Sequence, residues 1–565
     1  MGADVTYPWI ASYPDTVSWS ADVPVRPMHA YMDRAADTWA ARPAVDFLGK
    51  RYSYGQIGAL VNRAAKGFQA IGVTKGTRVG LCLPNTPYSV VCYYAVLKAG
   101  GTVVNYNPLY VERELAHQID DSHTEIMVTM DLEALYPKVA AMLSRTERLK
   151  RIVVCPMKDV LTRPKAILFG LFKRRELSLP PADAQHVLFA DLIDNDGQPA
   201  PVEIDPLVDV AVLQYTGGTT GLPKGAMLTH ANLAANVEQT VMWFSGLRLG
   251  EERILGVLPF FHVFAMTVVM NQAVAAGLEM ILMPRFDLKQ TMLAIHKKRP
   301  TLFPAVPTIY TAINNDPRAS RYDLSSIKFC LSGGAPLPVE VKHAFENLTG
   351  CRLVEGYGLS ESSPVATCNP TDGLNKEGSI GLPMPGTRIE IRDLESRDRV
   401  MPVGEKGEVC IVGPQVMKGY WDRPEETDEV LIDGRLHTGD VGYMDKDGYT
   451  FLVDRKKDLI LCSGYNVYPR VIEEAIYLHP AVAEVTVIGV DDAYRGQAPK
   501  AFVRLRDGEA LDEAGLKAFL ADKISKIEMP SQIEFRAELP KTMIGKLSKK
   551  ELVAEEKAKA GKDAG

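Results

Sequence analysis

The sequence predicts an α/β protein, with a large N-terminal domain of several subdomains and parallel-rich sheets, and a small α+β C-terminal domain. Strand-like and helical runs alternate through most of the chain, as in Val79–Leu83, Tyr88–Ala99 and Thr102–Asn105. This strand–helix–strand rhythm is typical of parallel sheets, because parallel neighbours need a crossover connection. The chain has 565 residues, which is too many for one hydrophobic core, so at least two domains are expected.

A charged break, Arg455–Asp458, predicts the boundary between the two domains, because it separates two apolar, strand-like runs, Tyr449–Val453 and Leu459–Cys462. The expected organisation is a large domain over residues 1–454, a hinge over 455–458 and a small, mobile domain over 459–565. From about Glu555 the chain is rich in Lys, Ala and Glu, and we expect a disordered tail there.

Composition and charge exclude several classes of protein. Hydrophobic residues make up 46% and charged residues 24%, which is ordinary for a soluble globular protein. The formal net charge is −6 and the pI is about 6.0, so nothing favours a nucleic acid as partner. The eight cysteines form no CxxC pair, so we expect buried thiols rather than a zinc site or a disulfide framework. Residues 1–20 lack the pattern of a signal peptide, and a cytoplasmic location is expected.

Two segments bear on membranes. The longest apolar region, Val263–Met283, contains Asn271, Gln272 and Glu279, so it predicts a buried strand–helix–strand rather than a transmembrane helix. The segment Leu161–Leu179 combines a short apolar core with basic residues on both sides. Such a segment can lie on an anionic membrane surface, so a peripheral membrane contact is one interpretation of it. The alternative is an ordinary surface helix or a linker.

A glycine-rich loop follows the apolar run Val210–Gln214 and reads YTGGTTGLPKG from Tyr215 to Gly225. Glycine lets backbone N–H groups turn toward an anion, threonine hydroxyls add donors or a metal contact, and lysine adds a point charge. The loop is not a Walker A motif, because Gly225 occupies the position where Ser or Thr is required. We therefore predict a polyphosphate cradle. Its residues are Thr216, Gly217, Gly218, Thr219, Thr220, Gly221 and Lys224.

The loop resembles the ATP signature of the adenylate-forming superfamily, which includes acyl-CoA synthetases, luciferases and the adenylation domains of peptide synthetases. The resemblance extends over roughly residues 30–550, and the other family motifs follow in the family's order. It implies that ATP and Mg²⁺ activate a carboxylate as an acyl-adenylate before a thiol is admitted. A carboxylate needs this activation because it is anionic and has a poor leaving group. The enzyme must also neutralise the charge that moves onto pyrophosphate.

Two motifs resemble the family's adenine-binding segments. The first is SGGAP at 332–336, similar to the adenine-contacting loop, and the second is EGYGLSE at 355–361. In the second, the resemblance implies that Tyr357 offers an aromatic face to adenine. Most relatives have Thr at the position of Ser360, so the hydroxyl is kept. The nucleotide-binding residues implied by these two motifs are Gly333, Gly334, Ala335, Pro336, Glu355, Gly356, Tyr357, Gly358 and Ser360.

Charged residues complete the implied nucleotide site. Glu361 is a hard oxygen ligand for Mg²⁺ and is expected to take part in catalysis, with Thr216 as a second metal contact. Asp440, in Thr438-Gly439-Asp440, matches the turn that binds both ribose hydroxyls. Arg455 matches an arginine that contacts ribose and phosphate.

The remaining motifs resemble the catalytic and thiol-binding parts of the family. Lys546, in PKTMIGK, matches the lysine that bridges the substrate carboxylate and the α-phosphate. His262 matches a residue on the path between carboxylate, phosphate and thiol. Lys457 lies at the family's hinge position. Ser463 and Gly464 resemble the loop that packs along the pantetheine arm of CoA once the small domain has rotated.

The segment around His262 bears on the acid that is activated. Amino-acid-adenylating domains have an Asp there to pair with the substrate ammonium, whereas this chain reads PFFHVFAM. An unpaired buried ammonium is costly, so Val263, Phe264 and Met266 indicate an apolar acid. The chain looks most like long-chain fatty-acid–CoA ligases. An aryl-acid CoA ligase and a non-catalytic binding protein on the same scaffold stay open as alternatives, as does a homodimer.

Overall fold

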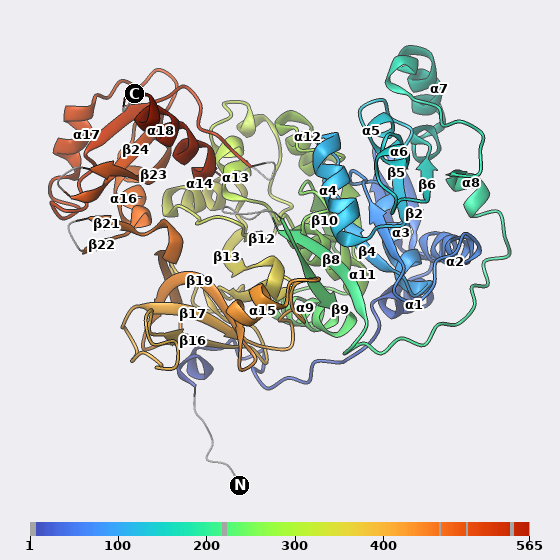
Figure 1. Ribbon diagram of the computed structural model, residues 1–565, viewed down its shortest axis with the longest axis horizontal. Helices are drawn as coiled ribbons and strands as arrows, with labels where there is room; N and C mark the ends of the chain where they lie inside the picture. The colour runs from blue at the N-terminus through green and yellow to red at the C-terminus, as the bar shows by residue number, and fades with distance from the viewer. Residues whose placement is uncertain (1–6, 217–222, 463–464, 493–494, 543–546, 564–565) are drawn as a thin grey trace, which may run out of the picture.

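The computed structural model describes residues 7–216, 223–462, 465–492, 495–542 and 547–563 (Figure 1). Within these ranges the largest sheet has seven strands, in the order β7-β6-β5-β3-β4-β8-β9, and all neighbours are parallel except β8 and β9. The strands are β3 (Arg78–Leu81), β4 (Thr102–Asn105), β5 (Ile126–Met130), β6 (Arg151–Cys155), β7 (His186–Leu188), β8 (Val210–Thr216) and β9 (Lys224–Thr229). The predicted α/β class with parallel-rich sheets is confirmed.

Helix α3 (Pro87–Lys98) connects β3 to β4, as the sequence predicts for Tyr88–Ala99. Eleven of its 12 residues are buried, because the helix is apolar on nearly every face and packs between the sheet and its neighbours α1 (His29–Thr38) and α2 (Tyr54–Ala70). A second apolar cluster includes side chains of α4 (Glu112–Ser122), α5 (Tyr136–Ala140) and α6 (Met142–Arg145) together with strand residues of the same sheet. Apolar layers on a mostly parallel sheet are what its continuous apolar strands require.

Two four-stranded sheets lie beside the seven-stranded sheet, within the described residues. One has the order β10-β11-β1-β2 and the other β12-β13-β14-β15. Their strands are β1 (Pro43–Phe47), β2 (Lys50–Ser53), β10 (Arg253–Gly256), β11 (Glu279–Leu282), β12 (Phe329–Ser332), β13 (Arg352–Gly358), β14 (Val365–Cys368) and β15 (Leu382–Pro383). The helices that accompany them are α9 (His230–Trp243), α12 (Leu288–Lys298), α13 (Pro307–Asn314) and α14 (Val339–Thr349).

The predicted strand–helix–strand over Val263–Met283 is wrong in its first part. The segment begins as α10 (Val263–Ala265), continues as the π-helix η4 (Met266–Asn271) and α11 (Gln272–Ala276), and only then forms β11. Short apolar runs do not distinguish a buried strand from a buried helix, and here burial against α9 and α1 decides for the helix.

The C-terminal half contains two antiparallel-rich sheets. The first consists of β16 (Arg388–Arg392), β17 (Gly407–Val412), β18 (Leu431–Ile432), β19 (Arg435–Met444) and β20 (Thr450–Arg455). The second consists of β21 (Ile460–Cys462), β22 (Tyr465–Val467), β23 (Val482–Asp492), β24 (Gly496–Leu505) and β25 (Gln532–Phe535). The chain passes between them through the short helix η7 (Lys456–Asp458), where the sequence predicts the hinge. Helices α16 (Pro469–Tyr477), α17 (Glu513–Leu520) and α18 (Lys549–Asp563) accompany the second sheet at the left of Figure 1. The domain limits and the hinge motion stay predictions.

The expected disordered tail is instead part of helix α18 (Lys549–Asp563). Ala, Lys and Glu are strong helix formers, so the same composition favours a helix once one end is anchored. Leu552 is buried, and Glu556 accepts an ion pair from Lys500 at 2.9 Å, which together supply that anchor.

The basic segment from 161 to 179 contains helix α7 (Arg163–Phe172) and the short helix η3 (Arg174–Glu176), and α7 projects from the body of the molecule (Figure 1). No residue of α7 is buried. Among the described residues, no helix is both long and apolar enough to cross a bilayer. All eight cysteines are free and buried, as predicted.

Candidate active site

The end of β8 and the start of β9 bring two of the predicted phosphate-binding residues together. Thr216 ends β8, Lys224 begins β9, and the two are register partners across this antiparallel pair. The predicted cradle residues Gly217, Gly218, Thr219, Thr220 and Gly221 fall within 217–222, outside the described residues. The cradle therefore stays a prediction, and only Thr216 and Lys224, at its two ends, have a defined geometry.

Tyr420 lies between Lys224 and Glu361. The Lys224 ammonium is 5.2 Å from the centre of the Tyr420 ring, a cation–π contact, and the Tyr420 hydroxyl donates to Glu361 Oε1 at 2.7 Å. Glu361, in η6 (Ser360–Ser362), also accepts a bond from Met417 N–H at its backbone carbonyl, at 2.8 Å. One aromatic residue thus orients both the predicted phosphate ligand and the predicted metal ligand. Sequence analysis missed Tyr420, because it is 59 residues from Glu361.

Buried Asp440 is the centre of a second group of polar side chains. Tyr357 OH donates to Asp440 Oδ2 at 2.6 Å, and Arg455 Nε donates to Asp440 Oδ1 at 3.0 Å. Asp440 and Arg455 are register partners on β19 and β20, which explains why residues 15 apart meet. Asp440 therefore joins the other two residues that are predicted to bind the same nucleotide. The aromatic contact of Tyr357 with adenine stays a prediction.

The motif from 355 to 361 links these two groups, since Tyr357 belongs to the Asp440 group and Glu361 to the Tyr420 group. Between them, Gly358 leaves no room for a side chain, because a Cβ there would lie 1.8 Å from the Pro364 carbonyl oxygen. Ser360 lies in η6 next to Glu361 and is half-buried. The compact turn therefore restricts where the Tyr357 ring and the Glu361 carboxylate lie relative to each other.

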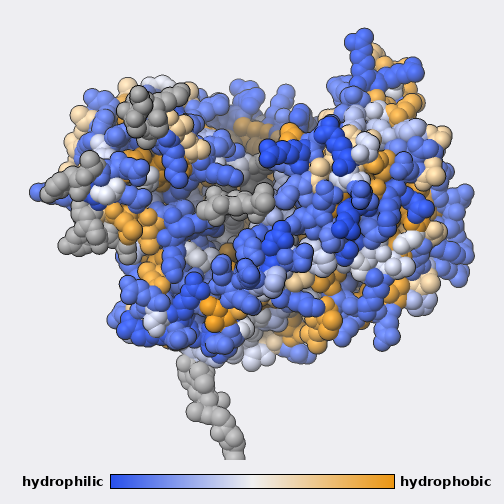
Figure 2. Space-filling view, viewed as in Figure 1, coloured by the Kyte–Doolittle hydropathy of each residue, from blue (hydrophilic) through white to orange (hydrophobic). Residues whose placement is uncertain are grey.

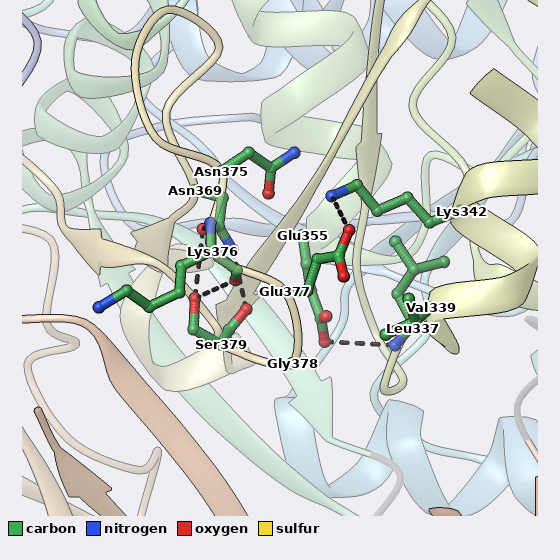
Figure 3. Close-up of a pocket in the computed structure, with 10 residues that line it drawn as sticks. All are labelled: Leu337, Val339, Lys342, Glu355, Asn369, Asn375, Lys376, Glu377, Gly378 and Ser379. Carbon is green, nitrogen blue, oxygen red and sulfur yellow. Dashed lines mark hydrogen bonds and ion pairs between the residues drawn. The ribbon is translucent and has the colours of Figure 1, made fainter. Parts of the chain in front are cut away.

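Glu355 lies in the middle of β13, opposite Ser332 of β12, beside a small pocket (Figure 3). Its Oε1 accepts a hydrogen bond from Leu337 N–H at 3.3 Å, and Figure 3 shows this carboxylate turned toward that backbone nitrogen. Burial raises the pKa of Glu355 to about 7, although the positive charge of Arg470 opposes the rise. Glu355 therefore faces the 337–342 segment and the charges of α16, and its role as a nucleotide ligand stays a prediction.

The predicted adenine loop follows β12. Of its residues, Gly333 is buried against the ring of Phe264, while Gly334 and Pro336 are exposed and Ala335 is half-buried. Gly356 is also half-buried and belongs to β13, the neighbour of β12. The structure thus brings Phe264, predicted for the acyl pocket, next to the loop predicted for adenine.

The chain around His262 is held by buried amides that sequence analysis missed. Asn85 Oδ1 accepts from Phe260 N–H at 2.8 Å, and its amide nitrogen donates to the Leu258 carbonyl at 2.7 Å. Gln214 Nε2 donates to the Phe261 carbonyl at 3.0 Å. His262 Nδ1 in turn accepts from Phe264 N–H at 3.3 Å. These bonds fix the backbone that presents the imidazole.

All three residues predicted for the acyl pocket, Val263, Phe264 and Met266, are buried in α10 and η4. The Met266 sulfur lies 3.3 Å from the amide nitrogen of Asn105. Their contact with substrate stays a prediction.

Several predicted residues belong to the C-terminal part of the chain. Lys546, Ser463 and Gly464 lie outside the described residues. Lys457 is in η7, at the connection between the two C-terminal sheets. Lys549, at the start of α18, forms an ion pair with Glu473 at 3.2 Å.

Comparison with known proteins identifies the family of the chain. Residues 32–421 match the AMP-binding enzyme family, and residues 471–546 match the AMP-binding enzyme C-terminal domain. The chain is 45% identical to a long-chain-fatty-acid–CoA ligase of Bacillus subtilis, over 97% of this chain and 98% of that protein. It is 36% identical to a protein of the same name from Salmonella typhimurium, over 98% and 99% of the two chains.

Solved structures agree as well. The crystal structure of ATP-bound MatB from Rhodopseudomonas palustris has a TM-score of 0.82 and 29% identity, covering 93% of this chain and 98% of that one. The predicted superfamily and its fold are confirmed, and the chain belongs to the AMP-binding enzyme family.

Proposed function

We propose that this protein ligates a medium- to long-chain fatty acid to coenzyme A through an acyl-adenylate, with release of AMP and pyrophosphate. The main support is the pair of side-chain groups joined by residues 355–361: Tyr357, Asp440 and Arg455 for the nucleoside, and Lys224 and Glu361 for the phosphates. The similarity to long-chain-fatty-acid–CoA ligases over nearly the whole chain supports the same reaction.

Mg²⁺ fits the residues at the phosphate end. Glu361 offers carboxylate oxygen, the ligand that Mg²⁺ prefers, and the Tyr420 hydroxyl keeps that carboxylate oriented. Thr216, at the end of β8, offers a hydroxyl as a second ligand. When bound, the ion would neutralise charge on the phosphate oxygens of ATP. Lys224 would add a further positive charge to the same phosphates.

The two half-reactions are assigned to different residues of the small domain. In our proposal Lys546 acts in adenylation, and Ser463 and Gly464 accept the pantetheine arm of CoA after the domain has rotated about Lys457. Lys546→Ala should then abolish acyl-AMP formation while sparing CoA transfer from supplied acyl-AMP. A bulky substitution of Gly464 should have the opposite effect. Equal loss of both half-reactions in both variants would count against two alternating conformations.

The apolar surroundings of His262 support a fatty acid as substrate. Val263, Phe264 and Met266 are buried, and no acidic residue follows His262 that could pair with an ammonium group. Each added methylene should raise kcat/KM by about fourfold at most, until the channel is full. An aryl acid such as a cinnamate or benzoate is the second candidate.

The test is incubation with ATP, CoA and a panel of acids, following AMP and the thioester. Formation of ADP would falsify the adenylate mechanism. A preference for coumarate or benzoate over every fatty acid would leave the mechanism intact and remove the substrate assignment. Absence of turnover with every acid would favour a non-catalytic binding protein.

We also propose that α7 brings the protein to an anionic membrane surface, where fatty acids partition. Ile167, Leu168, Leu171 and Phe172 are exposed on α7, and Figure 2 shows apolar and hydrophilic residues together on this projection. Arg163, Lys165, Lys173, Arg174 and Arg175 flank the apolar side chains. Apolar insertion combined with basic charge is the usual requirement for peripheral binding. A homodimer stays a prediction.

A further inference from the structure

The strand that carries Asp440 has a bulge at this residue. Along β17 and β19, Glu408 is the register partner of Val441, and Cys410 is the partner of His437. One residue of β17, Val409, therefore lies opposite three residues of β19, Thr438, Gly439 and Asp440. Bulges of this kind re-aim a side chain, and they are frequent next to active sites. Here the bulge directs Asp440 toward Tyr357 and Arg455.

The Glu408 carboxylate closes the bulge from the opposite strand. Its Oε1 accepts from Gly439 N–H at 3.0 Å, and its Oε2 lies 3.1 Å from His437 Nδ1. Glu408 is only 3% exposed, so both oxygens are used inside the protein. Gly439 has φ +71°, a conformation that glycine adopts readily, and a bulge built on it needs an external contact to select one geometry.

Hydrogen bonds hold the other residues of the bulge. Thr438 Oγ1 donates to the Val409 carbonyl at 2.7 Å and accepts from Asp440 N–H at 3.0 Å. The Glu408 bond to Gly439 is thus the side-chain contact that reaches the middle of the bulge from β17. Breaking it would leave the half-buried Gly439 N–H without this acceptor, which costs free energy.

A metal site is the competing explanation of this cluster. Glu408, Cys410 and His437 form the one group among the described residues whose potential ligand atoms all lie within 4.8 Å of one another. However, both Glu408 oxygens already have nitrogen partners. Burial also raises the pKa of the Cys410 thiol to about 12, which disfavours the thiolate that a metal would need. The hydrogen-bonded arrangement therefore accounts for the three residues.

We propose that Glu408, oriented by His437, is a positioning residue that holds the bulge so that Asp440 meets the ribose hydroxyls of ATP. Glu408 acts through Asp440 and does not itself touch the nucleotide. This inference rests on the proposed function, because it takes ATP as the ligand of Asp440.

The test measures how strongly the enzyme prefers ATP over 2′-deoxy-ATP and 3′-deoxy-ATP in pyrophosphate exchange. Glu408→Ala should reduce this preference by about tenfold or more, because a charge-assisted contact of Asp440 is lost. Glu408→Gln should keep most of it, since the amide oxygen can still accept from Gly439 N–H and the amide nitrogen can donate to His437. Cys410→Ala is the matched control, because Cys410 contacts His437 but the bonds to Thr438, Gly439 and Asp440 remain.

The preference is a ratio, so it does not depend on the fraction of active enzyme. If Glu408→Ala does not fold, His437→Leu replaces it and should reduce the preference by about threefold. An unchanged preference for ATP in the variant that folds overturns the proposal, and so does an equal loss of preference in Glu408→Gln and Glu408→Ala. The proposal is also overturned if native mass spectrometry finds zinc bound to the wild type and not to His437→Leu. Failure of the proposed function would give a different result, because the wild-type protein would then catalyse no pyrophosphate exchange, whichever acid is added.

Discussion

The bulge at 438–440 contains polar side chains in the interior of the protein, whereas helix α7 carries apolar side chains on the surface. At the bulge, polar and charged side chains are inside: Glu408 is 3% exposed and Asp440 is 4% exposed. On α7, apolar side chains are outside: Leu171 is 71% exposed and Phe172 is 79% exposed. Apolar burial stabilises folding and polar burial costs free energy unless it is compensated, so neither arrangement is selected for stability alone.

The two regions also differ in how their side chains are satisfied. Every buried carboxylate named at the bulge has nitrogen or hydroxyl partners, whereas the apolar side chains of α7 are left in water. A satisfied buried polar network favours one rigid geometry, which suits the recognition of a small polar ligand. An exposed apolar and basic surface suits a large, deformable partner such as a lipid surface. In our proposal the two regions therefore bind different ligands, a nucleotide at the bulge and a lipid surface at α7.

The largest effect is expected from Asp440→Asn, which breaks the polar end of this comparison. Two charge-assisted bonds to the ribose should be weakened by about 3 kcal/mol in total, so pyrophosphate exchange should fall by about 100-fold at limiting ATP. Asp433→Asn is the matched control, since Asp433 lies in the turn between β18 and β19 and its side chain is 76% exposed. Comparable losses in both variants would contradict the role of Asp440.

Glu355→Gln tests what happens when a buried carboxylate is less well compensated. The folded pKa of Glu355 is about 7, against 4.5 for the ordinary group, because burial favours the neutral acid. Because the folded pKa is raised, protonated Glu355 contributes to the stability of the folded protein. This contribution is complete below pH 4.5 and is lost as the pH rises through 7. The amide cannot ionise, so Glu355→Gln should unfold with a free energy higher by about 3 kcal/mol at pH 8, and with little difference near pH 4.5.

Urea unfolding of variant and wild type between pH 5 and pH 8 would measure this difference. Exposed Glu340→Gln shows whether removal of any glutamate from the same region gives the same trend. A difference in unfolding free energy that is flat with pH, or that falls toward pH 8, would contradict the raised pKa of Glu355.

The double substitution Leu171→Ser and Phe172→Ser tests the apolar end of the comparison. Membrane insertion of two such side chains contributes about 1–3 kcal/mol when it is partial, so binding to anionic vesicles should weaken by about 5- to 150-fold. The stability should change by less than about 0.5 kcal/mol, because both side chains are exposed. Leu97→Ala, in buried α3, is the contrast and should cost about 2–5 kcal/mol.

Charge separates the electrostatic part of that binding. Reversal at Lys173, Arg174 and Arg175 should weaken sedimentation with anionic vesicles but leave neutral vesicles unaffected, and high salt should have the same effect as the reversal. Vesicle binding that ignores both changes would leave residues 161–179 as an ordinary surface insertion.

The smallest effect is expected from Glu176→Gln, and its sign is opposite. Glu176 forms an exposed ion pair with Lys173, so its loss should change stability by less than about 0.5 kcal/mol. Removing the negative charge should strengthen binding to anionic vesicles by up to about fivefold, because one basic residue near the surface contributes about 1 kcal/mol. Weaker binding in this variant would argue against an anionic lipid partner.

The sequence alone determined the α/β class, the strand at Thr102–Asn105, helix α3 and the order of the motifs. Each of these depends on residues that are close together in the sequence. They are a periodic pattern of apolar residues, a glycine-rich turn, or an acidic residue that follows such a turn. The motif glycines, Asp440 and Arg455 were all predicted from such short stretches. The structure places Asp440 and Arg455 opposite each other on adjacent strands.

Tertiary structure alone decided which side chains orient those motifs. Tyr420 reaches Glu361 over 59 residues, Asn85 reaches Phe260 over 175, and Glu408 reaches Gly439 over 31, and no local pattern reveals such contacts. It also decided that residues 263–276 are helical, because they are buried against α9 and α1. It decided that the tail is part of α18, because the burial of Leu552 and the ion pair of Glu556 with Lys500 anchor a segment whose composition favours a helix. Local propensities are worth a few tenths of a kcal/mol per residue, so long-range packing and buried hydrogen bonds decide wherever the two disagree.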